Sequence, residues 1–352
     1  MAVSGHLLIL LLPVLSLCGA TEYYVRPTKP TNTSCPAQPC LTLSEYTSGS
    51  EHYFKSNTVF RFLPGTHHMD RPLIVNHVHN MSLESQSDES DEYPHLVAEF
   101  SCEMEGRECT YLYWSEYFYG FFDYSGFNVC CAAVGLHDVY NVTVKGISIT
   151  VQASHMSVVI LKNVSGITIQ LNVVCSLTDD TSNGAIGITM YEATSIEVHS
   201  SSANNCSYGL VLHSTTNIRI AKVTAMYNEL VGIAFDTSAD TNISSTIVAH
   251  NGQFGMIQAD MNNTHITNTT TAHNDEGGMI LADMNNTHIT NSTTAHNGLH
   301  GMFLLDMNNT HITSTTAAHN GFHGMYLLHM NNTHITHHYS TQWVWNGPVA
   351  HE

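Results

Sequence analysis

Short runs of alternating apolar and polar residues fill most of the chain, and Asn and Gly residues separate these runs. Between Gly301 and Leu304, Met302 and Leu304 fall on one face of an extended segment. In the run Thr264 to Thr267, Thr264 and Ile266 share a face, and the residues between and after them point the other way. Thr, Ile and Val, which favour strands, are frequent in such runs, and no run shows helical periodicity. The pattern predicts short β-strands with one buried face.

The C-terminal half repeats every 23 residues. The segment that begins at Met261 recurs at Met284, Met307 and Met330. Two further series keep the step, one of Asn (Asn205, Asn228, Asn251, Asn274, Asn297, Asn320) and one of Gly (Gly209, Gly232, Gly255, Gly278, Gly301, Gly324). A unit of two or three strands without a helix buries its apolar face only by stacking on copies of itself.

We therefore predict an all-β fold, a parallel β-solenoid whose coils lie ~4.8 Å apart. The Asn series is expected at a turn, because Asn tolerates left-handed backbone and stacked amides hydrogen-bond along the row. A leucine-rich repeat is the main alternative, but its L-x-x-L-x-L frame is absent.

The N-terminus and the cysteines indicate export. Residues 1–20 resemble a signal peptide, and no later stretch reaches the ~18 apolar residues of a membrane helix. The remaining eight Cys favour disulfides, with Cys35–Cys40 and Cys102–Cys109 as candidate pairs. Candidate glycosylation sites are Asn32, Asn80, Asn141, Asn163, Asn205, Asn242, Asn262, Asn268, Asn285, Asn291, Asn308 and Asn331. A chain rich in Asn and Thr also produces such sequons by chance.

Composition narrows the class of partner. Hydrophobic residues make up 43% of the chain, charged residues 11%, and the net charge is −19. This charge argues against nucleic-acid binding, which needs a basic surface. No Lys or Arg follows Lys222, although the last 130 residues hold 14 of the 25 His.

The repeats resemble the coils of secreted right-handed parallel β-helix proteins of the pectate-lyase-like superfamily. The segments Tyr23 to Val25, Pro39 to Leu43 and Phe60 to Thr66 resemble that family's first strand, short capping helix and opening coil. The resemblance implies a right-handed β-helix with ~23-residue coils. The expected organisation is a cap and first coils (21–83), an acidic and aromatic, Cys-rich decorated coil or insertion (84–133), β-helix coils (134–345, with regular 23-residue repeats from about residue 205) and a tail (346–352).

The resemblance also directs a search for catalytic residues, because the superfamily includes lyases, hydrolases and epimerases of acidic polysaccharides. The candidates are Asp179, Asp180, Arg219 and Lys222. The family's N-T-D and G-H-G motifs are absent between them, and Asp179 and Asp180 also fit an ordinary polar loop. We expect the four side chains to meet in one groove only if the chain is an enzyme.

Metal binding has two candidate rows. His265, His288, His311 and His334 are expected to stack on one outer face, and Asp260, Asp283 and Asp306 form a second row in which His329 takes the fourth position. Stacked imidazoles ~4.8 Å apart converge poorly on zinc, and carboxylates at that spacing in water repel by only ~0.9 kcal/mol. We therefore expect no resident cofactor, with Ca²⁺ or Zn²⁺ as the alternatives.

The sequence favours a secreted, glycosylated, non-enzymatic β-helix protein that binds extracellular glycans or proteins. The alternative is a polysaccharide lyase or glycoside hydrolase acting on acidic polysaccharide.

Overall fold

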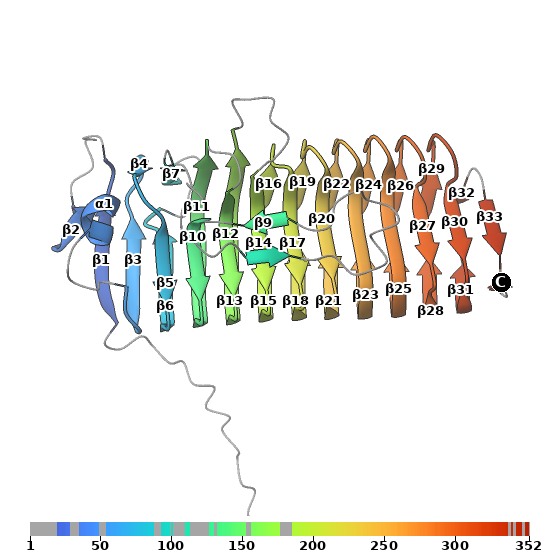
Figure 1. The fold of residues 1–352 in the computed structure, drawn as a ribbon, viewed down its shortest axis with the longest axis horizontal. Coiled ribbons are helices and arrows are strands. Elements are labelled where there is room, and N and C mark those ends of the chain that lie inside the picture. The colour runs from blue at the N-terminus through green and yellow to red at the C-terminus, as the bar shows by residue number, and fades with distance from the viewer. Residues whose placement is uncertain are drawn as a thin grey trace, which may run out of the picture.

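The protein is an elongated right-handed parallel β-helix (Figure 1). The computed structural model describes residues 20–28, 35–48, 54–87, 93–98, 100, 110–112, 127–129, 132–152, 156–176, 185–336, 339–340, 343–346 and 349–351. The strands form three parallel sheets, here called A, B and C, and each coil passes through them in that order. The predicted fold class and the 23-residue coil are confirmed, since the register in sheet A steps by 23 from β17 to β30.

Each sheet gains one strand, or one arm of a long strand, per coil. Sheet A contains β5 (Leu73–Asn76), β10 (Ala132–His137), β12 (Ser157–Lys162), β14 (Ile186–Tyr191), β17 (Tyr208–His213), β20 (Val231–Asp236), the first arms of β23 (Phe254–Thr267) and β25 (Gly277–Thr290), β27 (Met302–Leu305), β30 (Met325–Leu328) and β33 (Trp343–Asn346). Sheet B contains β1 (Thr21–Arg26), β3 (Thr58–Phe62), β6 (His79–Ser85), the first arms of β11 (Tyr140–Val151) and β13 (Ser165–Cys175), β15 (Thr194–His199), β18 (Thr216–Ala221), β21 (Ala239–Ser244), the second arms of β23 and β25, β28 (Asn308–Thr313), β31 (Asn331–Thr336) and β34 (Val349–His351).

Sheet C is the narrowest. It contains β4 (Thr66–Met69), β7 (His95–Ala98), the second arms of β11 and β13, β16 (Ser202–Asn204), β19 (Thr224–Met226), β22 (Ile247–Ala249), β24 (Thr270–Ala272), β26 (Thr293–Ala295), β29 (Thr316–Ala318) and β32 (Tyr339–Ser340). Its strand β7 lies within the range 84–133 and pairs with β4 and β11. Strands β8 (Thr110–Leu112) and β9 (Phe127–Val129), in the same range, form a separate antiparallel pair.

A short helix lies at the N-terminal end of the solenoid, as predicted (Figure 1). Helix α1 (Leu43–Ser48) follows β2 (Cys40–Thr42), which pairs with β1. Tyr46 of α1 is buried, and its hydroxyl donates to the carbonyl oxygens of Tyr24 and Pro39 at 3.1 Å. Its ring meets that of Phe60 edge-on at 5.5 Å. The helix therefore covers apolar residues that the first coil would otherwise expose.

The alternation predicted for the repeats sets the inside and outside of each coil. Thr264, Ile266, Met302 and Leu304 are buried, and His265 is exposed. In every regular coil the residues at the corners adopt left-handed backbone, among them Asp260, Asn263, Asn268 and His273. Among residues other than Gly, Asn and Asp tolerate this conformation best. The corners that they form therefore explain why these residues repeat.

A row of buried asparagine amides runs along the corner between sheets C and A. The side-chain Nδ2 of each Asn donates to Oδ1 of the Asn in the next coil, at 3.0 Å from Asn228 to Asn251 and 2.9 Å from Asn251 to Asn274. The row continues through Asn297 to Asn320. Each Oδ1 also accepts the backbone N–H of the preceding Asn. Polar groups that are buried at this corner are thereby satisfied.

Two details differ from the sequence prediction. The left-handed residue at this corner is the one before the Asn, namely His250, His273, His296 and His319, so the Asn is present for its hydrogen bonds alone. Asn205 is not in the row: it is itself left-handed, and Cys206 holds the position next to Asn228. One coil of 22 residues shifts the register by one, because Ser202 pairs with Thr224.

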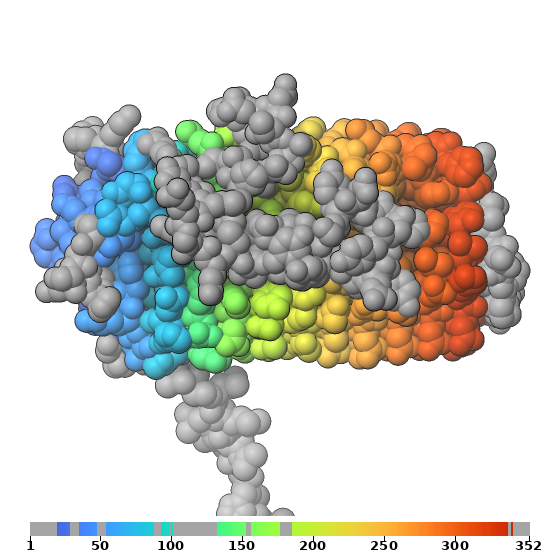
Figure 2. All heavy atoms as spheres, in the orientation of Figure 1, coloured from blue at the N-terminus to red at the C-terminus, as the bar shows by residue number. Residues whose placement is uncertain are grey.

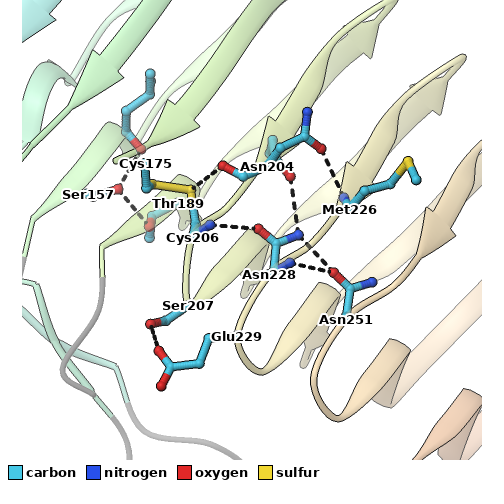
Figure 3. Close-up of a disulfide and its surroundings, with 12 residues drawn as sticks. Ser157, Cys175, Thr189, Asn204, Cys206, Ser207, Met226, Asn228, Glu229 and Asn251 are labelled. Atoms are coloured by element: carbon cyan, nitrogen blue, oxygen red, sulfur yellow. Dashed lines mark hydrogen bonds between the residues drawn. A yellow bond between two sulfur atoms is a disulfide. The ribbon is translucent and has the colours of Figure 1, made fainter. Parts of the chain in front are cut away.

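A disulfide lies where the asparagine row ends (Figure 3). Cys206 has no side-chain amide and therefore does not extend the row. Its backbone N–H donates to Asn228 Oδ1 at 3.1 Å, and its sulfur is bonded to Cys175 of the preceding coil. Closing a loop of 31 residues is worth about 3–4 kcal/mol in the chain-entropy model. A covalent bond therefore joins two coils at the point where the amide row stops.

Glycine is required beside this row. A Cβ on Gly255 would lie 2.7 Å from Asn274 Nδ2 and 2.6 Å from the Gly278 carbonyl oxygen. The Gly and Asn series that share the 23-residue step are thus two halves of one packing arrangement.

Replacing one asparagine of the row should destabilise the protein strongly. In Asn274→Ala, the backbone N–H and the amide of Asn251 lose their acceptor, and the Val248 carbonyl loses a donor. Leaving such buried groups unpaired should lower the free energy of unfolding by about 2–4 kcal/mol in urea denaturation. Asn262→Ala, which changes an exposed amide, is the control and should cost less than about 1 kcal/mol. Equal losses in the two variants would contradict this role of the row.

Candidate functional site

The outward face of sheet A is unusual in being apolar over several coils. Val211, Ala234, Ile257 and Ile280 occupy one outward row, and each is less than 8% exposed. They belong to an apolar cluster that is separate from the core inside the coils. Sheet A therefore differs from a polar outer face in carrying buried apolar residues on its outward side.

Four ionisable side chains occupy consecutive positions at the ends of sheet A strands, and we call them the ionisable row. They are Lys162 of β12, Tyr191 of β14, His213 of β17 and Asp236 of β20, paired in register. Asp236 is 1% exposed and accepts a hydrogen bond at Oδ2 from His213 Nδ1 at 3.0 Å. The His213 ring stacks on Tyr191 at 5.2 Å, and Lys162 Nζ lies 5.8 Å from the Tyr191 ring centroid.

This arrangement can support proton transfer. A buried carboxylate that accepts from Nδ1 fixes the imidazole and leaves Nε2 as its second nitrogen. Burial, and then the neighbouring Glu192, raise the pKa of the Tyr191 phenol, which therefore stays protonated at neutral pH. Burial, and then Lys162, lower the pKa of His137, which pairs in register with Lys162 on the N-terminal side of the ionisable row. The sequence did not reveal this row, because its members are 22 to 29 residues apart, in coils of unequal length.

A second group of side chains, which we call the aromatic platform, lies on sheet A and the adjoining corner in the last regular coils. It consists of His300, Phe303, Phe322, His323 and Tyr326. The rings of Phe303 and Tyr326 stack at 5.2 Å, and those of His300 and His323 also lie 5.2 Å apart. Phe322 is 54% exposed and contacts the His323 ring at 4.2 Å.

The platform offers rings and hydrogen-bonding groups together. Burial, and then the neighbouring His323, lower the pKa of His300, which favours its neutral form. A neutral imidazole has one donor and one acceptor nitrogen. Figure 2 shows the last coils in orange and red at the C-terminal end of the solenoid.

The two catalytic candidates that the structure describes, Arg219 and Lys222, lie away from sheet A. Arg219 lies on the outside of sheet B, where its guanidinium is 3.8 Å from the Glu197 carboxylate and mostly exposed. Lys222 is an exposed, left-handed corner residue after β18. Asp179 and Asp180 lie outside the described residues, so the meeting of all four in one groove stays a hypothesis.

The candidate metal-binding rows have the predicted spacing. The rings of His265, His288 and His311 stack at 4.8 and 4.9 Å, and His334 is tilted and 5.9 Å from His311. A second column runs along the corner from Tyr227 through His250, His273, His296 and His319, at 4.9–5.1 Å.

The Asp row lies at a different corner. Asp260, Asp283, Asp306 and His329 are all left-handed, and Asp306 accepts from His329 Nδ1 at 2.9 Å. Among the described residues, no three His, Cys, Asp or Glu side chains are grouped to hold a metal ion.

The structure describes some of the cysteines and sequon asparagines that were predicted from the sequence. The predicted Cys35–Cys40 disulfide is present, and Cys175–Cys206 is a second bond that the sequence did not single out. Cys102, Cys109 and Asn32 lie outside the described residues. Of the other sequon asparagines, Asn80 is partly exposed and the rest are exposed. Within the described part of the chain, no helix is long and apolar enough to cross a membrane.

The sheets, rows and corners define a right-handed parallel β-helix protein. A family model described as "Periplasmic copper-binding protein (NosD)" matches residues 140–343, more than half of the 352 residues. The chain belongs to the NosD family. None of the curated proteins compared with the chain matches it in sequence.

Several solved structures resemble the fold. The Dettilon tailspike protein has a TM-score of 0.51 at 13% identity, and the match covers 79% of this chain and 59% of that chain. The periplasmic alginate epimerase AlgG has a TM-score of 0.44 at 10% identity, covering 89% of this chain and 83% of that one. Pectate lyase Pel9A has a TM-score of 0.39 at 10% identity, covering 94% and 77%. The tailspike likeness extends to the fold and no further.

Acidification should destabilise the folded protein through its histidines. Burial lowers the pKa of His67, His288 and His300 below the ordinary value of 6.5, with neighbouring His charges adding to the effect at the last two. Because the unfolded chain then binds more protons, stability is present above pH 6.5 and is lost as the pH falls below it. The melting temperature should therefore fall as the pH is lowered from about 7.5 to about 5.5, a range that spans roughly one pH unit on either side of the unfolded-state pKa. Histidine NMR signals from these residues that titrate above pH 6.5 would contradict this expectation.

Proposed function

We propose that the protein is an exported, glycosylated β-helix protein that binds glycans at the aromatic platform without cleaving them. The carrying observation is the platform itself, in which exposed Phe322 adjoins two stacked ring pairs. The apolar face of a sugar ring packs against such rings, while its hydroxyls bond to neighbouring imidazole nitrogens. A solenoid presents these groups in register, which suits an extended ligand.

Charge selects the kind of glycan. After Lys222 the chain has nine Asp and Glu and no Lys or Arg, and the platform lies within this stretch. Because these coils supply no Lys or Arg to pair with a uronate or sulfate group, their net negative charge disfavours an anionic glycan. The ligand that fits is an uncharged glycan.

Export is supported by several independent features. The signal-like residues 1–20, the two disulfides and the periplasmic description of the NosD family all favour a compartment outside the cytoplasm. The exposed sequon asparagines are compatible with glycosylation in such a compartment.

The family description suggests copper binding, but the spacing of the described histidine columns does not suit a shared copper ion. Imidazole is a suitable ligand for copper and zinc. Two imidazole nitrogens that share an ion at about 2.1 Å each must lie within about 4.2 Å of one another. The centroids of the stacked, nearly parallel rings are 4.8–5.1 Å apart along both columns, and the tilted ring of His334 is 5.9 Å from that of His311. We assign no step to a bound metal.

A second candidate function is a polysaccharide lyase or glycoside hydrolase, and the ionisable row favours it. His213, held by Asp236, would act as the base, and the Tyr191 phenol would supply a proton to the leaving oxygen. Lys162 would offset the negative charge of an acidic sugar. Unlike the platform, this row includes a lysine, Lys162, and the coil of His213 also contains Arg219 and Lys222.

Removing a platform ring should weaken glycan binding. Phe322→Ala and Tyr326→Ala should each raise the Kd for the best neutral glycan on an array about 10-fold or more, since a ring contact of 1.4 kcal/mol corresponds to that factor. Tyr227→Ala removes an equally exposed ring, 59% against 54%, from a distant coil and is the matched control. Binding that is lost in Tyr227→Ala but kept in Phe322→Ala would place the site elsewhere.

The enzyme alternative has its own test. Purified protein is incubated with acidic polysaccharides, with and without Ca²⁺, and assayed for reducing ends and for unsaturated products. Our main proposal expects none. If products form, His213→Ala should lower their rate by about 10²–10⁴-fold, the usual contribution of a general base. Turnover that depends on His213 would replace the binding proposal with the enzymatic one.

A further inference from the structure

Four of the sequon asparagines form one continuous row on the surface. Asn262, Asn285, Asn308 and Asn331 pair in register from coil to coil, and all four are exposed. Their amides are hydrogen-bonded in sequence: Nδ2 of each donates to Oδ1 of the preceding Asn, at 3.3, 3.0 and 3.0 Å. We call these residues the sequon row.

Adjacent positions of the sequon row are too close for two glycans. Neighbouring coils of a parallel sheet lie ~4.8 Å apart, and a pyranose ring with its N-acetyl group is wider than this. Alternate positions have twice the separation. We propose that the folded, exported protein carries N-glycans on non-adjacent positions of the sequon row, for example Asn262 with Asn308 or Asn285 with Asn331, and never on two consecutive ones.

A single glycan is compatible with the row. In the transfer reaction Nδ2 forms a bond with the anomeric carbon of an oligosaccharide, whose bond to a lipid-pyrophosphate leaving group breaks, and Nδ2 loses one proton. The modified amide keeps its second N–H and its Oδ1. It can therefore still donate to the preceding coil and accept from the next one.

The modification must precede folding. The threonines that complete the four sequons, Thr264, Thr287, Thr310 and Thr333, point inward and are 0–3% exposed. A transferase that reads the hydroxyl of the sequon cannot reach it in a finished coil. In the unfolded chain the four sites are 23 residues apart and can all be modified. The exclusion is therefore imposed when coils stack, and chains with adjacent glycans cannot fold correctly.

The absence of Lys and Arg after Lys222 makes co-occupancy measurable. The protein is expressed in a eukaryotic secretory host, and the secreted and the cell-retained pools are purified separately. Trypsin applied to denatured protein releases residues 223–352 as one fragment that holds the whole sequon row and no Cys. Enzymatic release of the glycans in ¹⁸O-water converts each modified Asn into a labelled Asp, and fragmentation mass spectrometry then reads which positions were modified in the same molecule.

Secreted fragments should carry at most two modified positions in the sequon row, none of them adjacent, and adjacent pairs should be found only in the retained pool. The variant Asn285→Gln removes the position between Asn262 and Asn308 and should raise the yield of secreted protein that carries both. Asn242, which pairs in register with His265, is outside the row and should be modified independently of it. Adjacent glycans in the secreted pool, or a sequon row without any glycan, would overturn the proposal.

Discussion

The hydrogen bond between stacked asparagine amides is the interaction on which the regular half of the molecule depends. Inside the row, an amide such as that of Asn274 donates to the next coil and accepts two N–H groups from the coil before it. It holds the corner between sheets C and A at one spacing and leaves no room for a Cβ at the neighbouring glycine. The sheets on either side inherit their register from this corner, and with it the positions of every outward row.

The outward faces are not equivalent once the register is set. Sheet B displays histidine, threonine and asparagine in repeating rows, which is the ordinary polar surface of a duplicated unit. Sheet A displays an apolar row in its middle coils, the ionisable row beside it and the aromatic platform in its last coils. Among the described residues, sheet A thus carries its ionisable row in the earlier coils and its aromatic platform in the last regular coils.

The sequence was sufficient to predict the coil, the inward residues and the stacked asparagines, because a repeat fixes each of them through a single period. It was insufficient where the period changes. Between Lys162 and Asp236 the coils differ in length, so the side chains that meet there have no common spacing in the sequence. The same irregularity moved Cys206 into the position next to Asn228, which the 23-residue step had given to Asn205.

Residue type at the corners follows from the backbone. The members of the Asp row share a left-handed backbone that Asp, Asn and even His can adopt. Conversely, the buried pairing of Asp236 with His213 could not be foreseen, since an outward residue of a strand is expected to be exposed.

The disulfide between Cys175 and Cys206 gives the solenoid a mechanical boundary. Each coil is bonded only to the coils above and below it, so a pulling force or a fraying end would detach coils one after another from the C-terminal side. Such unzipping must stop at the covalent bond, where the amide row also begins (Figure 3). The coils before this bond would keep their fold while those after it detach and reattach one at a time.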